Sequence, residues 1–246
     1  MRSTALILYM ARSLDARLLA WVEHLQHALG SRYRCALVCN ERPPSRHKDS
    51  KFVLWVDDRE CRDRNVTGLT LYHPCITAWD KAFLFAEWLD HDFTWLIEDD
   101  VLVVDPDIFS RVDGAFPEAD LLMSPEFVVE REQRHGSWHW WRLFADGDGV
   151  TPSLPLPWYG TACRAQVLRA SRGMMRAART HLDRGLPHSN MVEYMWQTVA
   201  HHAGLAVAHP PEMAGLMQAS KGRRFYHAVK GGAEQDRLRR LLRPQR

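Results

Sequence analysis

The sequence contains no long hydrophobic run and few cysteines. Only five of its 246 residues are cysteine, their spacing is irregular, and no two are separated by exactly two residues. This pattern argues against a thiolate zinc site and against a disulfide framework, so we expect free, mostly buried thiols in a reducing compartment. The first apolar stretch, residues 5–10, is too short for a signal peptide or a membrane span. The sequence therefore predicts a cytoplasmic protein, or a catalytic domain of something longer.

The sequence also lacks an excess of charge of either sign. It has 32 Lys plus Arg residues against 30 Asp plus Glu, which gives a formal net charge of +2. A balance this close to neutral gives no reason to expect nucleic acid as a partner. Hydrophobic residues make up 46% of the chain and charged residues 25%, values typical of a globular protein. The length fits one domain spanning residues 1–246.

Strand-like and helix-like patterns alternate through the first half of the chain. An alternation of this kind predicts an α/β fold with a mixed, mostly parallel central sheet flanked by helices. In the second half, helical spacing is expected over 165–181 and 190–203, and the break between the halves falls near 104–116. The strands expected in the first half are 5–10, 33–39, 52–56 and 93–97, and the helices are 14–29 and 77–89.

Three consecutive carboxylates follow the apolar strand 93–97. They are Glu98, Asp99 and Asp100, and ligands of parallel sheets bind where strands end at their carboxyl edge. Clustered carboxylates repel one another unless a cation neutralises them, and hard oxygen ligands suit Mg²⁺ or Mn²⁺. The triplet therefore predicts a metal site that could bridge a diphosphate. The structural alternative is a solvated turn or a helix N-cap.

The triplet and the helix before it resemble the GT-A glycosyltransferases. The resemblance is carried by Trp79-Asp80-Lys81-Ala82 and by the segment from Trp95 to Asp100, although Glu98 stands where the family usually has Asp. It implies a Rossmann-like GT-A fold and an Mn²⁺- or Mg²⁺-dependent transfer of sugar from a UDP- or GDP-sugar to an acceptor hydroxyl. Residues 1–104 would bind the nucleotide sugar. Residues 105–246 would bind the acceptor, which could be a glycan, a lipid-linked molecule or a small molecule.

The resemblance assigns roles to the acidic triplet and to a late histidine. Asp100 would be the direct metal ligand, while Glu98 and Asp99 would contact ribose or metal-bound water. His227 would be a further ligand of the metal or of the diphosphate, and imidazole suits Mn²⁺. The alternative for His227 is one surface histidine among thirteen.

Other positions in the first half would contact the nucleotide. Tyr9 and Arg12 follow or end the first strand, where the base and ribose would dock, and Asp57-Asp58 end the third strand, where the nucleoside would be bound. Lys81 could neutralise diphosphate. Their structural alternatives are packing, loop and turn roles.

An inverting transfer needs a carboxylate that removes the proton of the acceptor hydroxyl. Glu193 resembles the acidic residue that the family places early in a helix for this role, and Glu212 and Asp183 are weaker alternatives. Glu193 could instead be the glutamate of a capping box with Asn190.

Aromatic and basic segments of the second half could contact the sugars or a membrane. Trp158-Tyr159-Gly160 would border donor sugar and acceptor, because aromatic faces stack on sugar rings and glycine permits close approach. The alternative for the tryptophans upstream is a small core under a long loop. A basic tail helix from residue 235 could make peripheral contact with an anionic membrane or a lipid-linked acceptor, although a solvated helix end is the simpler reading. The upstream tryptophans are Trp138, Trp140 and Trp141. The arginines of the tail are Arg237, Arg239, Arg240, Arg243 and Arg246.

Two other classes of protein compete with the glycosyltransferase. A nucleotidyltransferase usually has a glycine-rich phosphate loop after its first strand, whereas residues 11–15 read Ala-Arg-Ser-Leu-Asp. A non-catalytic sugar-binding module with a structural cation would not need the acidic pair Asp57-Asp58.

Overall fold

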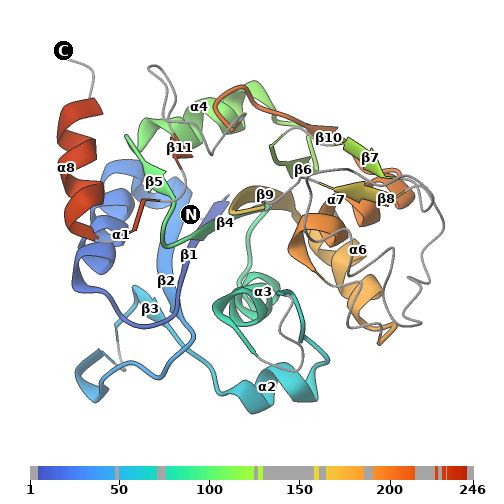
Figure 1. Ribbon diagram of the computed structural model, residues 1–246, viewed down its shortest axis with the longest axis horizontal. Coiled ribbons are helices and arrows are strands. Elements are labelled where there is room, and N and C mark those ends of the chain that lie inside the picture. Colours follow the sequence, from blue (N-terminus) through green and yellow to red (C-terminus); the bar gives the residue numbers. More distant parts are fainter. Residues whose placement is uncertain are drawn as a thin grey trace.

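The structure, a computed structural model, has one central sheet of seven strands in the order β10-β6-β9-β4-β1-β2-β3 (Figure 1). It describes residues 5–47, 50–70, 76–124, 127–129, 158–160, 165–185, 191–213, 225–226, 229–230 and 232–242. The strands of the sheet are β1 (Ala5–Ala11), β2 (Tyr33–Cys39), β3 (Val53–Leu54), β4 (Phe93–Glu98), β6 (Leu121–Leu122), β9 (Val167–Ser171) and β10 (Val207–Ala208).

The sheet is mixed and mostly parallel, which confirms the predicted fold class. β1 is parallel to β2 and to β4, β2 is parallel to β3, and β10 is parallel to β6. Only β9 runs the other way, because it is antiparallel to both β4 and β6. The carboxyl ends of the six other strands therefore meet at one edge, which we call the carboxyl edge. Strands from both predicted halves of the chain share this sheet.

Alternate residues of the buried strands pack into two cores, one on each face of the sheet. In β1, Leu6 and Leu8 enter one core while Ile7 and Tyr9 enter the other, as the period of a strand requires. The first core is covered by α3, α6 and α7, and the second by α1 and α4 (Figure 1). The bounds of these helices are α1 (Ala16–Leu29), α3 (Ala78–Trp88), α4 (Asp107–Ala115), α6 (Arg172–Leu182) and α7 (Val192–His202).

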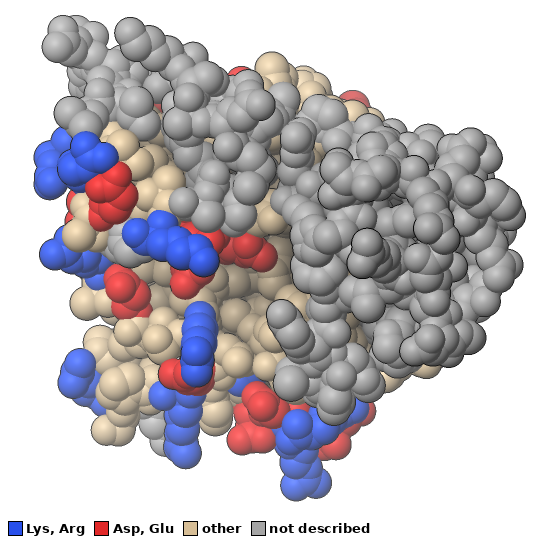
Figure 2. Space-filling model, viewed as in Figure 1, with Lys and Arg blue, Asp and Glu red and all other residues tan. Residues whose placement is uncertain are grey.

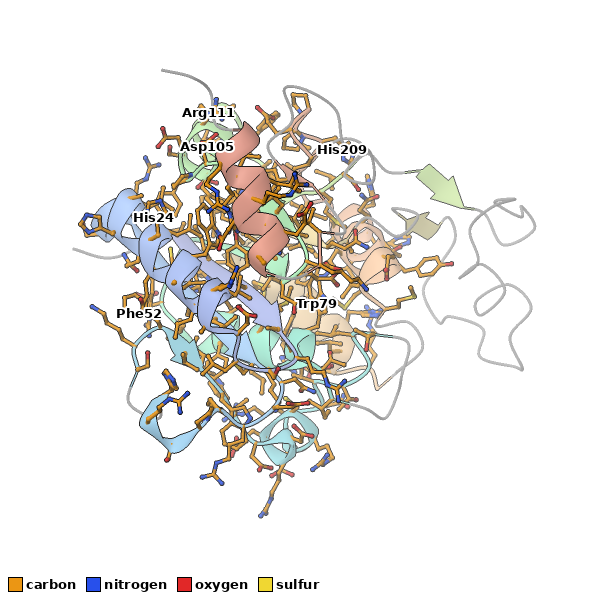
Figure 3. The ribbon with its side chains drawn as sticks, turned by 60° about the vertical axis from the view of Figure 1, so that its left-hand side comes forward. His24, Phe52, Trp79, Asp105, Arg111 and His209 are labelled. Carbon is orange, nitrogen blue, oxygen red and sulfur yellow. The ribbon has the colours of Figure 1, made fainter. Side chains whose placement is uncertain are left out.

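The C-terminal part of the chain returns to the first half. β11 pairs with β5 in an antiparallel ladder, and α8 lies beside α1 (Figures 1 and 3). A second small ladder joins β7 to β8. The remaining elements are η1 (Gly30–Arg32), η2 (Ser45–His47), α2 (Asp58–Asp63), β5 (Leu102–Val103), β7 (Phe127–Val129), β8 (Trp158–Gly160), β11 (Phe225–Tyr226) and α8 (Gly232–Leu242).

One expectation for the middle of the chain is wrong. The helix expected over 165–181 is strand β9 followed by α6, because Arg169 lies fully buried inside the sheet and is neutralised there by Asp113. Residues 104–116, where the two predicted halves meet, contain α4, whose apolar side packs Ile108 and Phe109 against the sheet.

The described thiols and surface agree with the composition. Cys35, Cys39 and Cys61 are free and buried, and burial raises the pKa of each thiol. Cys75 and Cys163 lie outside the described residues. Over the described part of the face in Figure 2, acidic and basic side chains are interspersed. Among the described residues, no helix has the length and apolar character needed to cross a bilayer.

Candidate active site

The acidic triplet forms a tight turn at the centre of the carboxyl edge. Glu98 is the last residue of β4 and lies opposite Met10 of β1. The backbone N–H of Asp99 donates to the carbonyl of Met10 over 3.0 Å, and the N–H of Val101 donates to the carbonyl of Glu98 over 3.1 Å. The turn therefore begins where the two most central parallel strands end, as the sequence predicts.

A tryptophan of α3 positions the first carboxylate of the triplet. The indole Nε1 of Trp79 donates to Oε1 of Glu98 over 2.9 Å, and the Trp79 side chain is buried near the middle of the molecule (Figure 3). Sequence reasoning quotes Trp79 only as part of a motif and misses this role. The role could have been inferred from the position of Trp79 in the first turn of α3, because that turn lies at the carboxyl edge.

The second carboxylate lies among like charges. Partial burial, followed by the neighbouring carboxylate of Asp100 and that of Asp15, raises the pKa of Asp99 above its usual range. Asp15 is the N-cap of α1, where its carboxylate accepts from the N–H groups of Arg17 and Leu18 over 2.8 Å. Sequence reasoning also misses Asp15, which lies at the start of the predicted helix 14–29. Carboxylates crowded in this way favour a cation between them.

The predicted general base lies close enough to the triplet to interact with it. Glu193 is in the first turn of α7, and that turn is tied down by a 3.0 Å bond from the N–H of Val192 to the carbonyl of Leu69. Burial, and after it the charge of Glu98, raises the pKa of Glu193 to about 7. The N-cap of α7 is Met191, and Asn190, the partner in the alternative capping box of Glu193, lies outside the described residues.

The C-terminal segment clamps the same turn. The N–H of Val229 donates to the carbonyl of Asp100 over 2.8 Å, and Nε2 of Gln235 donates to the carbonyl of Asp99 over 2.7 Å. Gln235 is buried, and its side-chain oxygen accepts from Arg239 of the same helix over 2.9 Å. His227 lies outside the described residues, but β11 before it and Val229 after it contact β5 and the acidic turn.

Of two residues near the end of β1 that are predicted to contact the nucleotide, Tyr9 lies in the core and Arg12 lies on the surface. The side chain of Tyr9 is fully buried, and its hydroxyl accepts from Nε1 of Trp21 over 2.9 Å. Burial raises the pKa of Tyr9 far above its usual range. Tyr9 is therefore a core residue and offers no surface to a base. Arg12 is exposed and pairs with Glu41 over 2.9 Å, so it remains on the surface beside the end of β1.

The acidic pair after β3 is used within the fold. Asp57 is the N-cap of α2 and accepts from the N–H of Arg59 over 2.9 Å. Asp58 pairs with Nζ of Lys81 over 2.8 Å, and Nζ also donates to the carbonyl of Asn40 over 2.5 Å. Because Lys81 is only 1% exposed and already bonded, the prediction that it neutralises diphosphate is wrong for this conformation. Asp58 remains half-buried at the carboxyl edge.

The alternative bases differ in their surroundings. Asp183 ends α6, is exposed, and pairs with Arg179 over 3.5 Å, which gives it a partner away from the triplet. Glu212 follows β10, whose carboxyl end lies at the carboxyl edge, and its Oε2 is buried without a hydrogen-bond partner in the described part of the chain. Glu212 therefore remains the second candidate.

The remaining predicted segments are only partly described. β8, which contains Trp158, Tyr159 and Gly160, packs beside α7, the helix that carries Glu193. In the tail, Arg239 is buried over the Trp21 ring, whereas Arg237, which pairs with Glu234, and Arg240 are exposed. The predicted residues that lie outside the description are Trp138, Trp140, Trp141, Arg243 and Arg246.

The donor set at the turn suits a hard divalent cation bound together with phosphate. In the described part of the chain, no three His, Cys, Asp or Glu side chains are placed to hold a metal by themselves. Mg²⁺ sites of phosphate-processing enzymes commonly use one or two carboxylates, with the substrate phosphates and water completing the shell. Asp99 and Asp100 meet that requirement. The pKa of Asp99 is raised first by burial and then by the neighbouring Asp100 carboxylate, whose repulsion a cation would relieve.

Comparison with known proteins gives only distant likeness. No protein-family model and no curated protein matches the sequence. Among solved structures, the chain is similar to the bifunctional IspDF from Campylobacter jejuni, with 9% identity, a TM-score of 0.44 and coverage of 96% of this chain. The chain spans 54% of the length of that protein.

Two further structures match over nearly their whole length. A glycosyltransferase involved in the glycosylation of the major capsid of PBCV-1 is 11% identical, with a TM-score of 0.46 and coverage of 97% of this chain and 99% of that one. The 2-C-methyl-D-erythritol 4-phosphate cytidylyltransferase from Thermus thermophilus is 10% identical, with a TM-score of 0.47 and coverage of 98% and 99%. Likeness this weak leaves the function to be argued from the residues themselves.

Proposed function

We propose that this protein is a metal-dependent glycosyltransferase that moves a sugar from a nucleotide-diphosphate sugar to an acceptor hydroxyl with inversion. The observation that carries the proposal is that Glu193 lies near the acidic turn. A carboxylate with a pKa of about 7 lies within electrostatic range of Glu98, at the edge of the sheet where ligands bind. A base with a pKa near the working pH is well matched to removing a hydroxyl proton.

In this mechanism the acidic turn binds the donor diphosphate and α7 supplies the base. Asp99 and Asp100 would hold Mn²⁺ or Mg²⁺, which supplies charge neutralisation to the departing diphosphate. Glu193 accepts the acceptor's hydroxyl proton as the hydroxyl oxygen bonds to the anomeric carbon. The bond from that carbon to the diphosphate oxygen breaks, and its electron pair leaves with the nucleoside diphosphate. Trp79 keeps Glu98 in place beside this centre.

Nucleotide binding is the first step to test. We expect UDP or GDP to raise the midpoint of thermal unfolding in the presence of Mn²⁺, and to do so much less in EDTA. Asp100→Asn should remove the Mn²⁺-dependent part, whereas Arg111→Gln, an exposed change on α4, should keep it. If no nucleoside diphosphate stabilises the protein with Mn²⁺, the proposal fails.

The reaction products separate glycosyl transfer from nucleotidyl transfer. A glycosyltransferase releases a nucleoside diphosphate from the sugar nucleotide. A nucleotidyltransferase run in its synthetic direction releases inorganic pyrophosphate from a nucleoside triphosphate. The absence of glycine from residues 11–15 favours the former. Pyrophosphate release that depends on Asp100, with no turnover of any sugar nucleotide, would overturn the assignment in favour of nucleotidyl transfer.

A further inference from the structure

A cavity of about 760 Å³ opens beside the edge strand β3, away from the acidic turn. Its wall is made by the start of β2, the connection from β2 to β3, β3 itself and the side of α3. Phe52, which precedes β3, marks this side of the molecule, while Trp79 lies nearer the middle (Figure 3). None of the described lining residues belongs to the acidic turn or to α7. The side chains that matter here are Arg34, Arg42, His47, Lys51 and Trp55.

The described lining of this cavity carries basic side chains and no carboxylate. Arg34, Arg42 and Lys51 are exposed. Glu41, which directly precedes Arg42, is engaged by Arg12 outside the cavity. Several cations around one concave space repel one another, and an anion bound among them removes that repulsion.

An aromatic ring organises the cations. The guanidinium carbon of Arg42 lies 5.3 Å from the centre of the Trp55 ring, within the range of a cation–π contact. Nζ of the buried Lys81 lies 5.3 Å from the same ring, and the Trp55 indole N–H donates to the carbonyl of Asn40 over 3.3 Å. Trp55 is therefore held in place from within the fold, and it holds Arg42 at the mouth of the cavity.

We propose that this cavity is a second ligand site, which binds a phosphoryl group independently of divalent metal. Arg42, Lys51 and Arg34 bind the phosphoryl oxygens, and the Trp55 ring packs against the remainder of the ligand. A guanidinium recognises phosphate through paired N–H donors, and a volume of about 760 Å³ accommodates a small organic phosphate. The site differs from the acidic turn in sign: it attracts the anion directly, whereas the turn needs a cation between its carboxylates and the ligand.

The test measures the binding of inorganic pyrophosphate to the full chain in the presence of EDTA. Isothermal titration calorimetry gives the affinity at low and at high salt. We expect metal-independent binding that weakens as salt rises. The double variant Arg42→Gln/Lys51→Gln should weaken binding by at least about tenfold, the loss typical of removing one hydrogen bond to a charged group. Arg111→Gln, which removes a single positive charge from an exposed position outside the cavity, is the control for a general loss of charge, and Asp100→Asn is the control for the acidic turn. Neither should weaken binding.

Vesicles distinguish the source of the phosphoryl group. Cosedimentation with phosphatidylcholine vesicles containing phosphatidic acid, lost in Arg42→Gln/Lys51→Gln but kept in Arg111→Gln, would assign the site to a lipid headgroup. Pyrophosphate binding without cosedimentation would assign it to a soluble phosphate. The proposal is overturned if neither probe binds, if the double variant binds like the wild type, or if binding requires Mn²⁺ and Asp100. Both changed residues are exposed, so the unfolding midpoint should stay unchanged and verify that the variant is folded.

Discussion

Charged side chains are buried at both edges of the central sheet, and the two clusters are balanced differently. At the edge where β2 and β4 begin, the Arg169 guanidinium lies 2.9 Å from the Asp113 carboxylate, with side chains 0% and 7% exposed. The Tyr33 hydroxyl donates to the same carboxylate over 2.6 Å, and Arg169 also donates to the carbonyls of Phe116 and Ala119. Each charge here has a partner of opposite sign.

At the carboxyl edge the interacting charges have the same sign. Burial and then Glu98 raise the pKa of Glu193, while burial and then Asp100 raise that of Asp99. A cluster whose charges are balanced in this way needs no ligand to neutralise it. A cluster of like charges is tolerated where a ligand or a proton completes it, and strongly shifted carboxylates concentrate at functional sites. The first cluster therefore needs no ligand to neutralise it, and the second is where we propose the chemistry.

The largest effect is expected from breaking the balanced cluster. Arg169→Met leaves the Asp113 carboxylate buried without its counter-charge, and should lower the free energy of unfolding by about 3–5 kcal/mol. Denaturant unfolding monitored by tryptophan fluorescence measures the change. Arg169→Met/Asp113→Leu removes both charges and should recover part of the loss. A single variant as stable as the wild type would show that the pair is not what holds this edge.

A substitution in the like-charged cluster should lower catalytic activity while the protein stays folded. Glu193→Gln keeps the size of the side chain but cannot accept a proton, so turnover should fall by about 10²- to 10⁴-fold while nucleotide-diphosphate binding is kept. Single-turnover and thermal-shift measurements separate the two properties. Glu212→Gln is the matched comparison at the same edge and should cost much less. If Glu212→Gln causes the larger loss and Glu193→Gln does not, the base is Glu212.

The pH dependence of stability sharpens the same contrast. Burial and Glu98 raise the folded-state pKa of Glu193 from 4.5 to about 7, so between these values the folded chain binds more protons than the unfolded chain. Stability therefore falls as pH rises through this window. Glu193→Gln removes that loss. The melting temperature of the variant minus that of the wild type should therefore increase between about pH 5 and about pH 8. Burial raises the pKa of Asp80 to about 6, and this contribution cancels in the difference. A difference that does not change with pH contradicts the raised pKa.

The sequence predicts the parallel part of the fold well because its strands are short apolar runs bounded by polar turns. The predicted strand 33–39 and the end of helix 14–29 agree with β2 and α1. β9 is missed because Arg169 interrupts its apolar run, and the Asp113 partner that permits a buried arginine is 56 residues away in sequence. Long-range compensation of this kind leaves no local signal.

The site is predictable where it depends on position along a strand and unpredictable where it depends on contact. Acidic residues after β4 could be located at the carboxyl edge from the strand pattern alone. Which carboxylates are already used could not, because Asp58 pairs with Lys81 across two helices and Asp57 caps one of them. Tyr9 is misread for the same reason: it lies inside β1, which continues to Ala11, and the alternation of the strand turns its side chain into the core.

The smallest effect is expected from loosening the clamp between α8 and the acidic turn. Gln235→Leu removes the donor to the carbonyl of Asp99 and the acceptor for Arg239, and should lower the free energy of unfolding by about 1–3 kcal/mol. Because the clamp holds the backbone of the turn and not its carboxylates, Mn²⁺-dependent nucleotide-diphosphate affinity should weaken without being lost. Arg240→Gln, an exposed neighbour on the same helix, should change neither quantity. Unchanged affinity together with reduced stability would make the Gln235 contact a purely structural support of the turn.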